Sequence, residues 1–247
     1  MTASDEPEYV TATRAAYDTV AADYATRLAD ALDSNPFDRA VLALYADLVL
    51  SAAPGAGSPV VEIGCGPGRI TAHLAGLGLH MLGIDLSPAM IEQARRHHPV
   101  LEFRVGQMAA LDQDPDLPAG DIVGLVAWYS LIHIPPAEHS AVLAGFRRAL
   151  APGGHLLLAF HAGDERHHIT DAYGHSGLSY DAYRLSPERL EQQAVQAGFE
   201  PVARLVREPI STPIGSEKTP QAYLLLRAGD EDAGSGETAF SPAPPME

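Results

Sequence analysis

Residues 60–68 read Val-Val-Glu-Ile-Gly-Cys-Gly-Pro-Gly, so an apolar stretch runs directly into a turn with three glycines. Pro59–Ile63 predicts a short buried strand, and a helix is expected to follow as far as about Leu77. Glycine lets the backbone turn sharply, and it lets a ligand approach the main chain with no side chain in the way. The helix behind the turn has free amide groups at its N-terminus. The stretch therefore predicts a ligand-binding turn between a strand and a helix, with a tight turn alone as the alternative.

Strands and helices alternate along the rest of the chain. Helices are expected to begin at Ser87-Pro88, Pro135-Pro136 and Ser186-Pro187, since serine is a good N-cap and proline suits the first helical turn. Further strands are predicted at His80–Ile84, Leu101–Val105, Asp121–Ala127, Leu156–Phe160, Phe199–Val206 and Ala222–Leu226. This alternation predicts an α/β domain with a doubly wound, mainly parallel sheet and right-handed crossovers.

A carboxylate stands where it could meet a ligand at the glycine turn. Asp85 ends the second predicted strand, 17 residues after Gly68. In a doubly wound sheet the carboxyl ends of neighbouring strands share one edge, where a carboxylate can accept both ribose hydroxyls of an adenosine. The alternative is that Asp85 only caps the turn that follows it.

The spacing of the glycines bears on which nucleoside is bound. Dinucleotide-binding loops follow G-x-G-x-x-G, whereas this turn follows G-x-G-x-G. Glu62 lies inside the first strand, where an acid is unfavourable for a pyrophosphate but suits a cation such as a sulfonium with an ammonium group. Both features argue against a nicotinamide-dependent oxidoreductase.

From about Tyr9 to Arg227 the chain resembles the class I S-adenosylmethionine-dependent methyltransferases, in particular those that act on small molecules. The matching stretches, in chain order, are VVEIGCGPGRITAHLA, LGIDLSPAMIEQAR, FRVGQMAAL, DIVGLVAWYSLIHIP and FRRALAPGGHLLLAF. The resemblance implies a Rossmann-like seven-stranded sheet with flanking helices, an antiparallel strand in its last pair, and S-adenosylmethionine as cofactor. It also implies that Gly64, Gly66 and Gly68 pass under the methionine part while Asp85 holds the ribose.

Other residues are expected to complete the cofactor site. Relatives often carry an acid after the third strand for the adenine amino group, and here Gln107 stands there with an amide oxygen that can accept the same hydrogen bond. Met108 is expected on the adenine face or in the core, and Ile63 and Leu86 wall the nucleoside. The full set of expected cofactor-binding residues is Tyr17, Glu62, Gly64, Gly66, Gly68, Asp85, Leu86, Gln107, Met108 and Trp128.

The first predicted helix, Tyr9–Leu32, carries Tyr17 and Tyr24 on one face together with Val20 and Ala21. The resemblance implies that residues 1–52 form a helical lid over the cofactor. The alternative is that the two tyrosines pack on the sheet.

The acceptor is expected at the ends of the fourth and fifth strands. His133 and His161 are the candidate general bases, since imidazole titrates near neutrality. Residues 161–185 are rich in histidine and tyrosine and are interpreted as a substrate cap. The candidate substrate-contacting residues are Tyr24, Tyr129, His133, His161 and Tyr173. No histidine or acid spacing matches a metal-ligand motif, so no metal is expected.

Composition excludes several classes of partner. The net charge of −16 repels a phosphate backbone and an anionic membrane surface. No apolar run approaches the length of a membrane span, no secretory signal is recognised, and a single cysteine excludes a disulfide framework. We expect a cytoplasmic protein with one domain over residues 1–228 and a disordered acidic, proline-containing tail over 229–247. The oligomeric state stays open.

Together these features predict methyl transfer from S-adenosylmethionine to an O, N or activated aromatic carbon of a small molecule in natural-product (secondary) metabolism. The acceptor is expected to be flat or aromatic. The alternatives are a protein or peptide methyltransferase and a non-catalytic S-adenosylmethionine-binding protein.

Overall fold

A seven-stranded sheet forms the centre of the computed structural model, which describes residues 6–52, 57–117, 120–213 and 215–229. The strand order is β3-β2-β1-β4-β5-β11-β8, and β11 runs antiparallel to both of its neighbours. The strands span β1 Pro59–Ile63, β2 His80–Asp85, β3 Glu102–Val105, β4 Ile122–Trp128, β5 Leu150–His161, β8 Phe199–Arg207 and β11 Gln221–Ala228. The Rossmann-like, mainly parallel sheet predicted from the sequence is confirmed.

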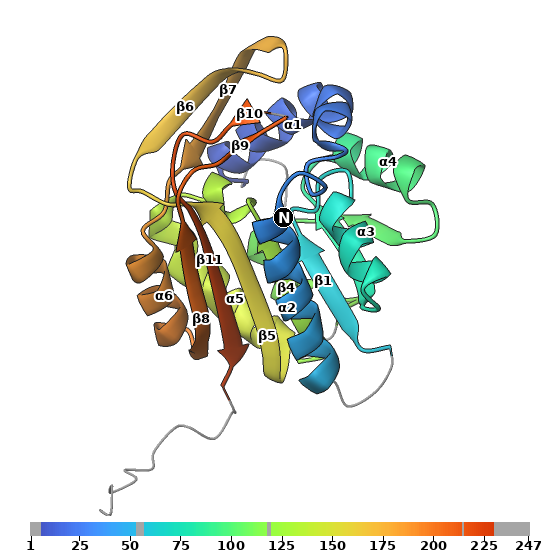
Figure 1. Ribbon diagram of the computed structural model, residues 1–247, viewed down its shortest axis with the longest axis vertical. Coiled ribbons are helices and arrows are strands. Elements are labelled where there is room, and N and C mark those ends of the chain that lie inside the picture. Colours follow the sequence, from blue (N-terminus) through green and yellow to red (C-terminus); the bar gives the residue numbers. More distant parts are fainter. Residues whose placement is uncertain (1–5, 53–56, 118–119, 214, 230–247) are drawn as a thin grey trace, which may run out of the picture.

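Helices cover both faces of this sheet (Figure 1). They span α1 Glu8–Leu28, α2 Pro36–Ala52, α3 Arg69–Gly76, α4 Pro88–His97, α5 His139–Ala149 and α6 Pro187–Gln196, with short 3-10 helices at η1 Met108–Gln113, η2 Leu131–His133 and η3 Pro136–Glu138. The two Ser-Pro pairs begin helices as predicted. Ser87 Oγ accepts from the Met90 amide at 3.1 Å, and Ser186 Oγ accepts from the Arg189 amide at 3.3 Å.

The core consists of two apolar layers, one on each face of the sheet. Phe146 of α5 and Phe160 of β5 are fully buried in one layer, and Tyr45 of α2 is fully buried in the other beside Trp128. The side chains of α2 therefore pack against the sheet. Of the segment predicted as a lid, only α1 lies over the carboxyl ends of the strands.

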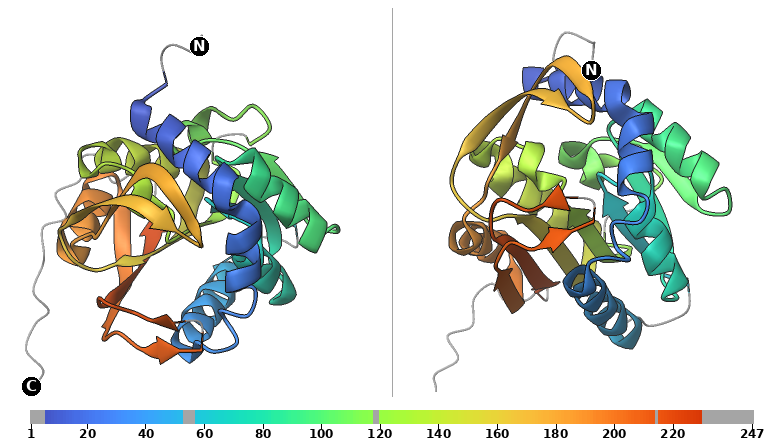
Figure 2. Two further views of the ribbon diagram at one scale, coloured as in Figure 1. Left: turned by 90° about the horizontal axis from the view of Figure 1, so that it is seen from above. Right: turned by 45° about the horizontal axis from the view of Figure 1, so that its top comes forward.

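Residues 161–185 form a structure that the sequence did not predict in detail. β6 Arg166–Ala172 and β7 His175–Tyr183 pair as an antiparallel hairpin that rises beside α1 (Figures 1 and 2). Most of β6 is exposed, so its sequence lacks the apolar alternation that identifies a half-buried strand. A second small hairpin joins β9 Ser211–Thr212 and β10 Gly215–Ser216.

Helix α1 and the β6–β7 hairpin share a small apolar cluster of their own. Val20 and Ala21 of α1 pack with Met90 of α4 and with Leu178 and Tyr180 of β7. This cluster fixes α1 above the sheet edge at which Asp85 and the glycine turn lie.

Two further predictions concern the C-terminal tail and membrane-spanning segments. The predicted tail lies outside the described residues except for Gly229, whose amide donates to the Gly198 carbonyl at 3.0 Å. Among the helices of the described residues, none has both the length and the apolar character needed to cross a membrane.

Candidate functional site

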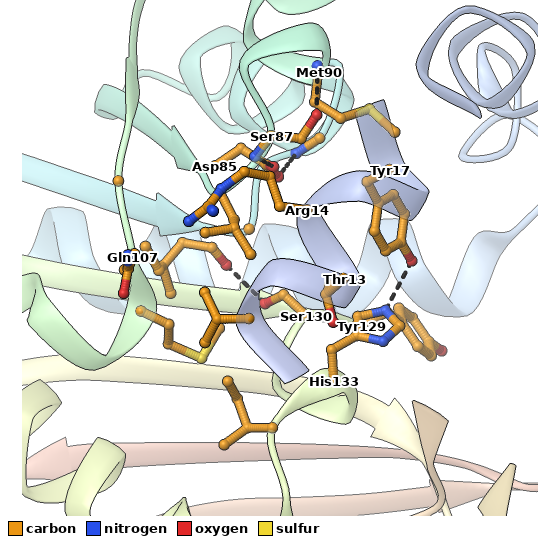
Figure 3. A pocket seen from close by; sticks show the side chains of 18 of the residues that line it. Thr13, Arg14, Tyr17, Asp85, Ser87, Met90, Gln107, Tyr129, Ser130 and His133 are labelled. Carbon is orange, nitrogen blue, oxygen red and sulfur yellow. Dashed lines mark hydrogen bonds between the residues drawn. The ribbon is translucent and has the colours of Figure 1, made fainter. Parts of the chain in front are cut away.

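A pocket lies under α1 at the carboxyl ends of β1, β2 and β4. Its walls come from α1, the glycine turn after β1, the turns after β2 and β3, and the segment after β4 (Figure 3). Gln107 and the Tyr17–His133 pair lie on opposite sides of it (Figure 3).

The glycine turn approaches the chain after β4 too closely for any side chain at its first position. Gly64 has φ of 76°, and a Cβ built on it would lie 2.2 Å from Ser130 Cβ. Ser130 in turn donates its hydroxyl to the Ile63 carbonyl at 2.7 Å. At Gly66, with φ of 54°, a Cβ would have only Tyr24 within 4 Å, at 3.7 Å. Gly64 therefore lets the turn pack against Ser130, and Gly66 leaves the main chain open on the side of Tyr24, where both glycines line the pocket.

Asp85 both caps its turn and faces the pocket, so the two interpretations of this residue are compatible. Its Oδ2 accepts from the Gly66 amide at 2.7 Å and its Oδ1 accepts from the Ser87 amide at 2.8 Å. Burial raises the pKa of this carboxyl to about 6. Each oxygen retains a lone pair that could accept a ligand hydroxyl.

Two of the residues expected in the cofactor site lie behind the turn and do not line the pocket. Glu62 is 1% exposed, and its carboxylate accepts a hydrogen bond from the Thr71 hydroxyl. Burial raises the pKa of Glu62 to about 8. Gly68 is the N-cap of α3, where a Cβ would lie 2.6 Å from the Phe103 ring. These residues support the turn, and direct contact with a ligand stays a prediction for both.

The other expected cofactor residues line the pocket. Leu86, Gln107, Met108 and Trp128 do so together with Tyr17 of α1. Gln107 donates through Nε2 to Glu6 Oε1 at 2.6 Å.

Helix α1 is tied to the segment after β4 by a hydrogen bond inside the pocket. The Tyr17 hydroxyl lies 2.8 Å from His133 Nε2, and His133 Nδ1 lies 3.1 Å from the Asp181 carbonyl of β7 (Figure 3). Because a carbonyl can only accept, Nδ1 carries the proton and Nε2 accepts from the tyrosine. Burial lowers the pKa of His133 to about 4, so the ring is neutral at pH 7.

The remaining candidate substrate residues divide into two groups. Tyr24 and Tyr129 line the pocket, and Tyr129 has φ of 53°, which is strained for a bulky residue. His161 and Tyr173 stand behind them, with ring centroids 4.9 Å from Tyr129 and Tyr24 respectively. His161 Nδ1 lies 2.9 Å from Gln221 Oε1.

Sequence reasoning missed Glu6, Arg14 and Ser130. Arg14 lies three residues before Tyr17 and therefore on the same helical face, which is the signal that could have identified it. Glu6 and Ser130 carry no such signal, since their partners lie 101 and 67 residues away. In the described part of the chain no group of three or more His, Cys, Asp or Glu side chains could hold a metal ion.

Comparison with known proteins finds relatives of the part of the chain that carries most of the pocket. Residues 60–154 match a family model described as a methyltransferase domain. The chain is 28% identical to a malonyl-[acyl-carrier protein] O-methyltransferase of Erwinia billingiae over 61% of this chain and 62% of that protein. It is 34% identical to a trans-aconitate 2-methyltransferase of Methylobacterium nodulans over 46% and 42% of the two chains. A further relative, 32% identical over 50% of this chain and 43% of its own length, is an S-adenosyl-L-methionine-dependent Diels-Alderase of Talaromyces variabilis. These alignments span 42% to 62% of the relatives' own lengths.

Solved structures share the fold over most of the chain. A magnesium protoporphyrin IX methyltransferase of Synechocystis with bound S-adenosylmethionine superposes with a TM-score of 0.63 at 17% identity, covering 91% of this chain and 99% of that one. A 1,6-didemethyltoxoflavin-N1-methyltransferase of Burkholderia thailandensis superposes with a TM-score of 0.62 at 19% identity, covering 92% and 93%.

A pair of glycine substitutions tests the close approach at the turn. Gly64 and Gly177 have similar φ values of 76° and 78°, but a Cβ on Gly177 would have nothing within 4 Å. Gly177→Ala should therefore cost only the left-handed strain, about 1–2 kcal/mol. Gly64→Ala should cost roughly 1–3 kcal/mol more, because Ser130 must move. Urea unfolding measures both, and equal losses of stability would contradict the packing described at Gly64.

Proposed function

We propose that this chain, in which residues 60–154 belong to the methyltransferase domain family, transfers the methyl group of S-adenosylmethionine to an O, N or activated aromatic carbon atom of a small molecule. The observation that carries the proposal is the composition of one pocket. It combines a side-chain-free turn at Gly64 and Gly66, the carboxylate of Asp85 and the amide of Gln107. A carboxylate for ribose hydroxyls beside a bare turn is typical of nucleoside sites.

The proposed binding mode follows from these positions. Asp85 would accept hydrogen bonds from the ribose hydroxyls. Leu86 and Met108 would enclose the adenine, and Gln107 would accept a hydrogen bond from the adenine amino group. The methionine part would pass over Gly64 and Gly66. Glu62 would act through the turn or through water, since Thr71 already occupies its carboxylate.

The aromatic walls support a flat acceptor. Tyr17, Tyr24, Trp128 and Tyr129 all line the pocket, and the Tyr17 and Tyr24 rings meet edge to face with centroids 5.9 Å apart. When bound, S-adenosylmethionine supplies an electrophilic methyl group. The protein must then hold the acceptor atom in line, exclude water and remove a proton where the acceptor carries one.

His133 is the better placed of the two candidate bases. It lines the pocket as a neutral ring whose Nε2 accepts from Tyr17, whereas His161 lies behind Tyr129. The acceptor could give its proton to Nε2 after Tyr17 moves aside. It could also give it to the Tyr17 oxygen while the tyrosine passes its own proton to Nε2. In this proposal His161 is a positioning residue.

The wider setting is also proposed. The small-molecule acceptors in the names of relatives support a small-molecule acceptor here, and the acidic chain is expected to act in the cytoplasm without nucleic-acid or membrane partners. Natural-product metabolism is one setting that fits. The Diels-Alderase relative favours one alternative, in which S-adenosylmethionine is bound without methyl transfer.

Calorimetry and label transfer test the proposal together. We expect S-adenosylmethionine and S-adenosylhomocysteine to bind and NAD not to bind. Transfer of a labelled methyl group is then screened across phenols, indoles, amines, carboxylates and a peptide mixture. Binding of NAD without either S-adenosyl ligand would refute the proposal, and tight S-adenosyl binding with no transfer to any acceptor would support the non-methylating alternative.

The protonation of Asp85 predicts how binding depends on pH. Ribose hydroxyls donate to the ionised carboxylate, whose pKa in the unliganded pocket is raised to about 6 by burial. S-adenosylhomocysteine affinity should therefore be constant above pH 7 and fall as pH drops through 6, approaching about tenfold per pH unit. Asp85→Ala should weaken binding roughly 10- to 150-fold at pH 8, the scale of hydrogen bonds to a charged group, and should remove this pH dependence. Asp47→Ala, at an exposed position on α2, is the control. An Asp85→Ala affinity equal to the parent's would remove this residue from the site.

Substitution of the histidines tests the proton route. His133→Ala should lower turnover by roughly 10²–10⁴-fold with little change in S-adenosylhomocysteine affinity. His133→Gln should recover little, because an amide can accept a hydrogen bond but cannot take the proton. His161→Ala should mainly raise the acceptor KM. If both Ala variants turn over at the parent rate between pH 5 and 8, catalysis rests on positioning alone.

A further inference from the structure

Glu6 joins the N-terminal end of α1 to the pocket through four hydrogen bonds. Its carboxylate accepts from Arg14 Nη1 and Nη2 at 2.7 and 2.6 Å, from the Thr11 hydroxyl at 3.0 Å and from Gln107 Nε2 at 2.6 Å. The two Arg14 bonds form a bidentate pair, the geometry that most strongly fixes a carboxylate. The side chains of Glu6 and Arg14 are only 22% and 29% exposed.

This contact decides which way the Gln107 amide faces. An amide side chain carries a donor, its NH₂ group, and an acceptor, its oxygen, and it can rotate to present either one to a neighbour. Beside an ionised carboxylate only the NH₂ group can face Glu6, since two oxygens would repel each other. The Arg14 hydrogen bond, with smaller contributions from Thr11 and Gln107, lowers the pKa of Glu6 to about 2. The carboxylate is therefore ionised at any working pH.

The oxygen of the Gln107 amide, Oε1, is left for a ligand. In the described part of the chain no hydrogen bond uses Gln107 Oε1, and Gln107 lines the pocket. An oxygen held in this way accepts from an amino group and rejects a carbonyl. A carboxylate at position 107 would accept in either orientation, so an orienting partner is needed only because the residue is an amide.

We propose that Glu6 is a positioning residue that holds the Gln107 amide as a hydrogen-bond acceptor, so that the pocket selects a 6-aminopurine over a 6-oxopurine nucleoside. This inference rests on the proposed function, in which Gln107 meets the adenine. Adenine presents an amino group at position 6, whereas hypoxanthine presents a carbonyl there and a donor at N1. Facing that carbonyl, Gln107 Oε1 would lose its hydrogen bond and meet a second acceptor.

The test compares two ligands that differ only at the base, S-adenosylhomocysteine and S-inosylhomocysteine, by calorimetry on the full chain at pH 7.5. The parent should prefer the adenosine ligand by roughly 10- to 100-fold, the range for leaving a buried polar group unsatisfied. In Glu6→Gln the new amide can accept from Arg14 and donate to Gln107 Oε1, which turns Gln107 Nε2 toward the base. The preference should then fall by about tenfold or more, or reverse.

Two further variants separate orientation from a general loosening of α1. Adding Gln107→Glu to Glu6→Gln should restore the preference for the adenosine ligand, because a carboxylate accepts from both neighbours. Glu8→Gln removes an exposed acid from the first turn of α1 and should leave the preference unchanged.

The outcomes distinguish this inference from the proposed function. If the parent binds neither ligand, the proposed function fails and this assignment fails with it. If the parent binds S-adenosylhomocysteine but Glu6→Gln weakens both ligands equally, Glu6 only fastens α1 and the inference is wrong. A collapse of the preference in Glu6→Gln with rescue in the double variant supports it.

Discussion

The carboxylate of Asp85 holds together two of the loops that line the pocket, the turns after β1 and β2. Parallel pairing of β1 with β2 sets Ile63 opposite Ile84, so the next residue of β2 stands beside the glycine turn. There Asp85 accepts one backbone hydrogen bond from each loop, from the Gly66 amide and from the Ser87 amide. Two hydrogen bonds to one buried charge fix the turn more strongly than bonds between neutral groups would.

The same set of hydrogen bonds extends to helix α1. Ser87, whose amide Asp85 holds, donates its hydroxyl to Asp18 of α1 at 2.6 Å and caps α4 with the same oxygen. Tyr9 donates to Glu138 at 2.7 Å, and His175 Nε2 lies 2.8 Å from Asp23. Polar contacts at several points along α1, together with the apolar cluster around Val20, hold the helix over the pocket.

Burial inside this enclosure biases its titratable groups toward their neutral forms. Desolvation raises the pKa of Asp85 to about 6 and that of Glu62 to about 8, and it lowers the pKa of His133 to about 4. Both carboxylates therefore reduce the stability of the empty fold as pH rises from their ordinary values through the raised ones, since the unfolded chain ionises them more easily. His133 reduces it as pH falls from 6.5 toward 4. A ligand whose hydroxyls donate to ionised Asp85 would offset part of this cost, which links the stability of the pocket to its occupation.

In the proposed reaction, a methyl acceptor that must lose a proton and the Tyr17 hydroxyl of α1 would compete for one atom in the pocket. His133 Nε2 is the only ring nitrogen of that residue with a lone pair, and Tyr17 occupies it. The contact that holds α1 and the proposed proton removal would therefore involve the same nitrogen. His133 also ties the segment after β4 to the β6–β7 hairpin through the Asp181 carbonyl, while the Asp181 carboxylate pairs with Arg166 at 2.8 Å.

The sequence by itself determined the sheet, the glycine turn, the serine caps and the place of Asp85, because each depends on residues close together in the chain or on strand order. It did not determine the β6–β7 hairpin, whose polar strands are stabilised by pairing and by contact with α1. Nor did it determine that Glu62 faces Thr71, that Tyr17 meets His133 across 116 residues, or that Glu6 meets Gln107 across 101. The last two contacts join segments that only the folded sheet brings together. Burial and hydrogen-bond partners set the charge and orientation of a side chain, so its role at the site was decided by the tertiary structure.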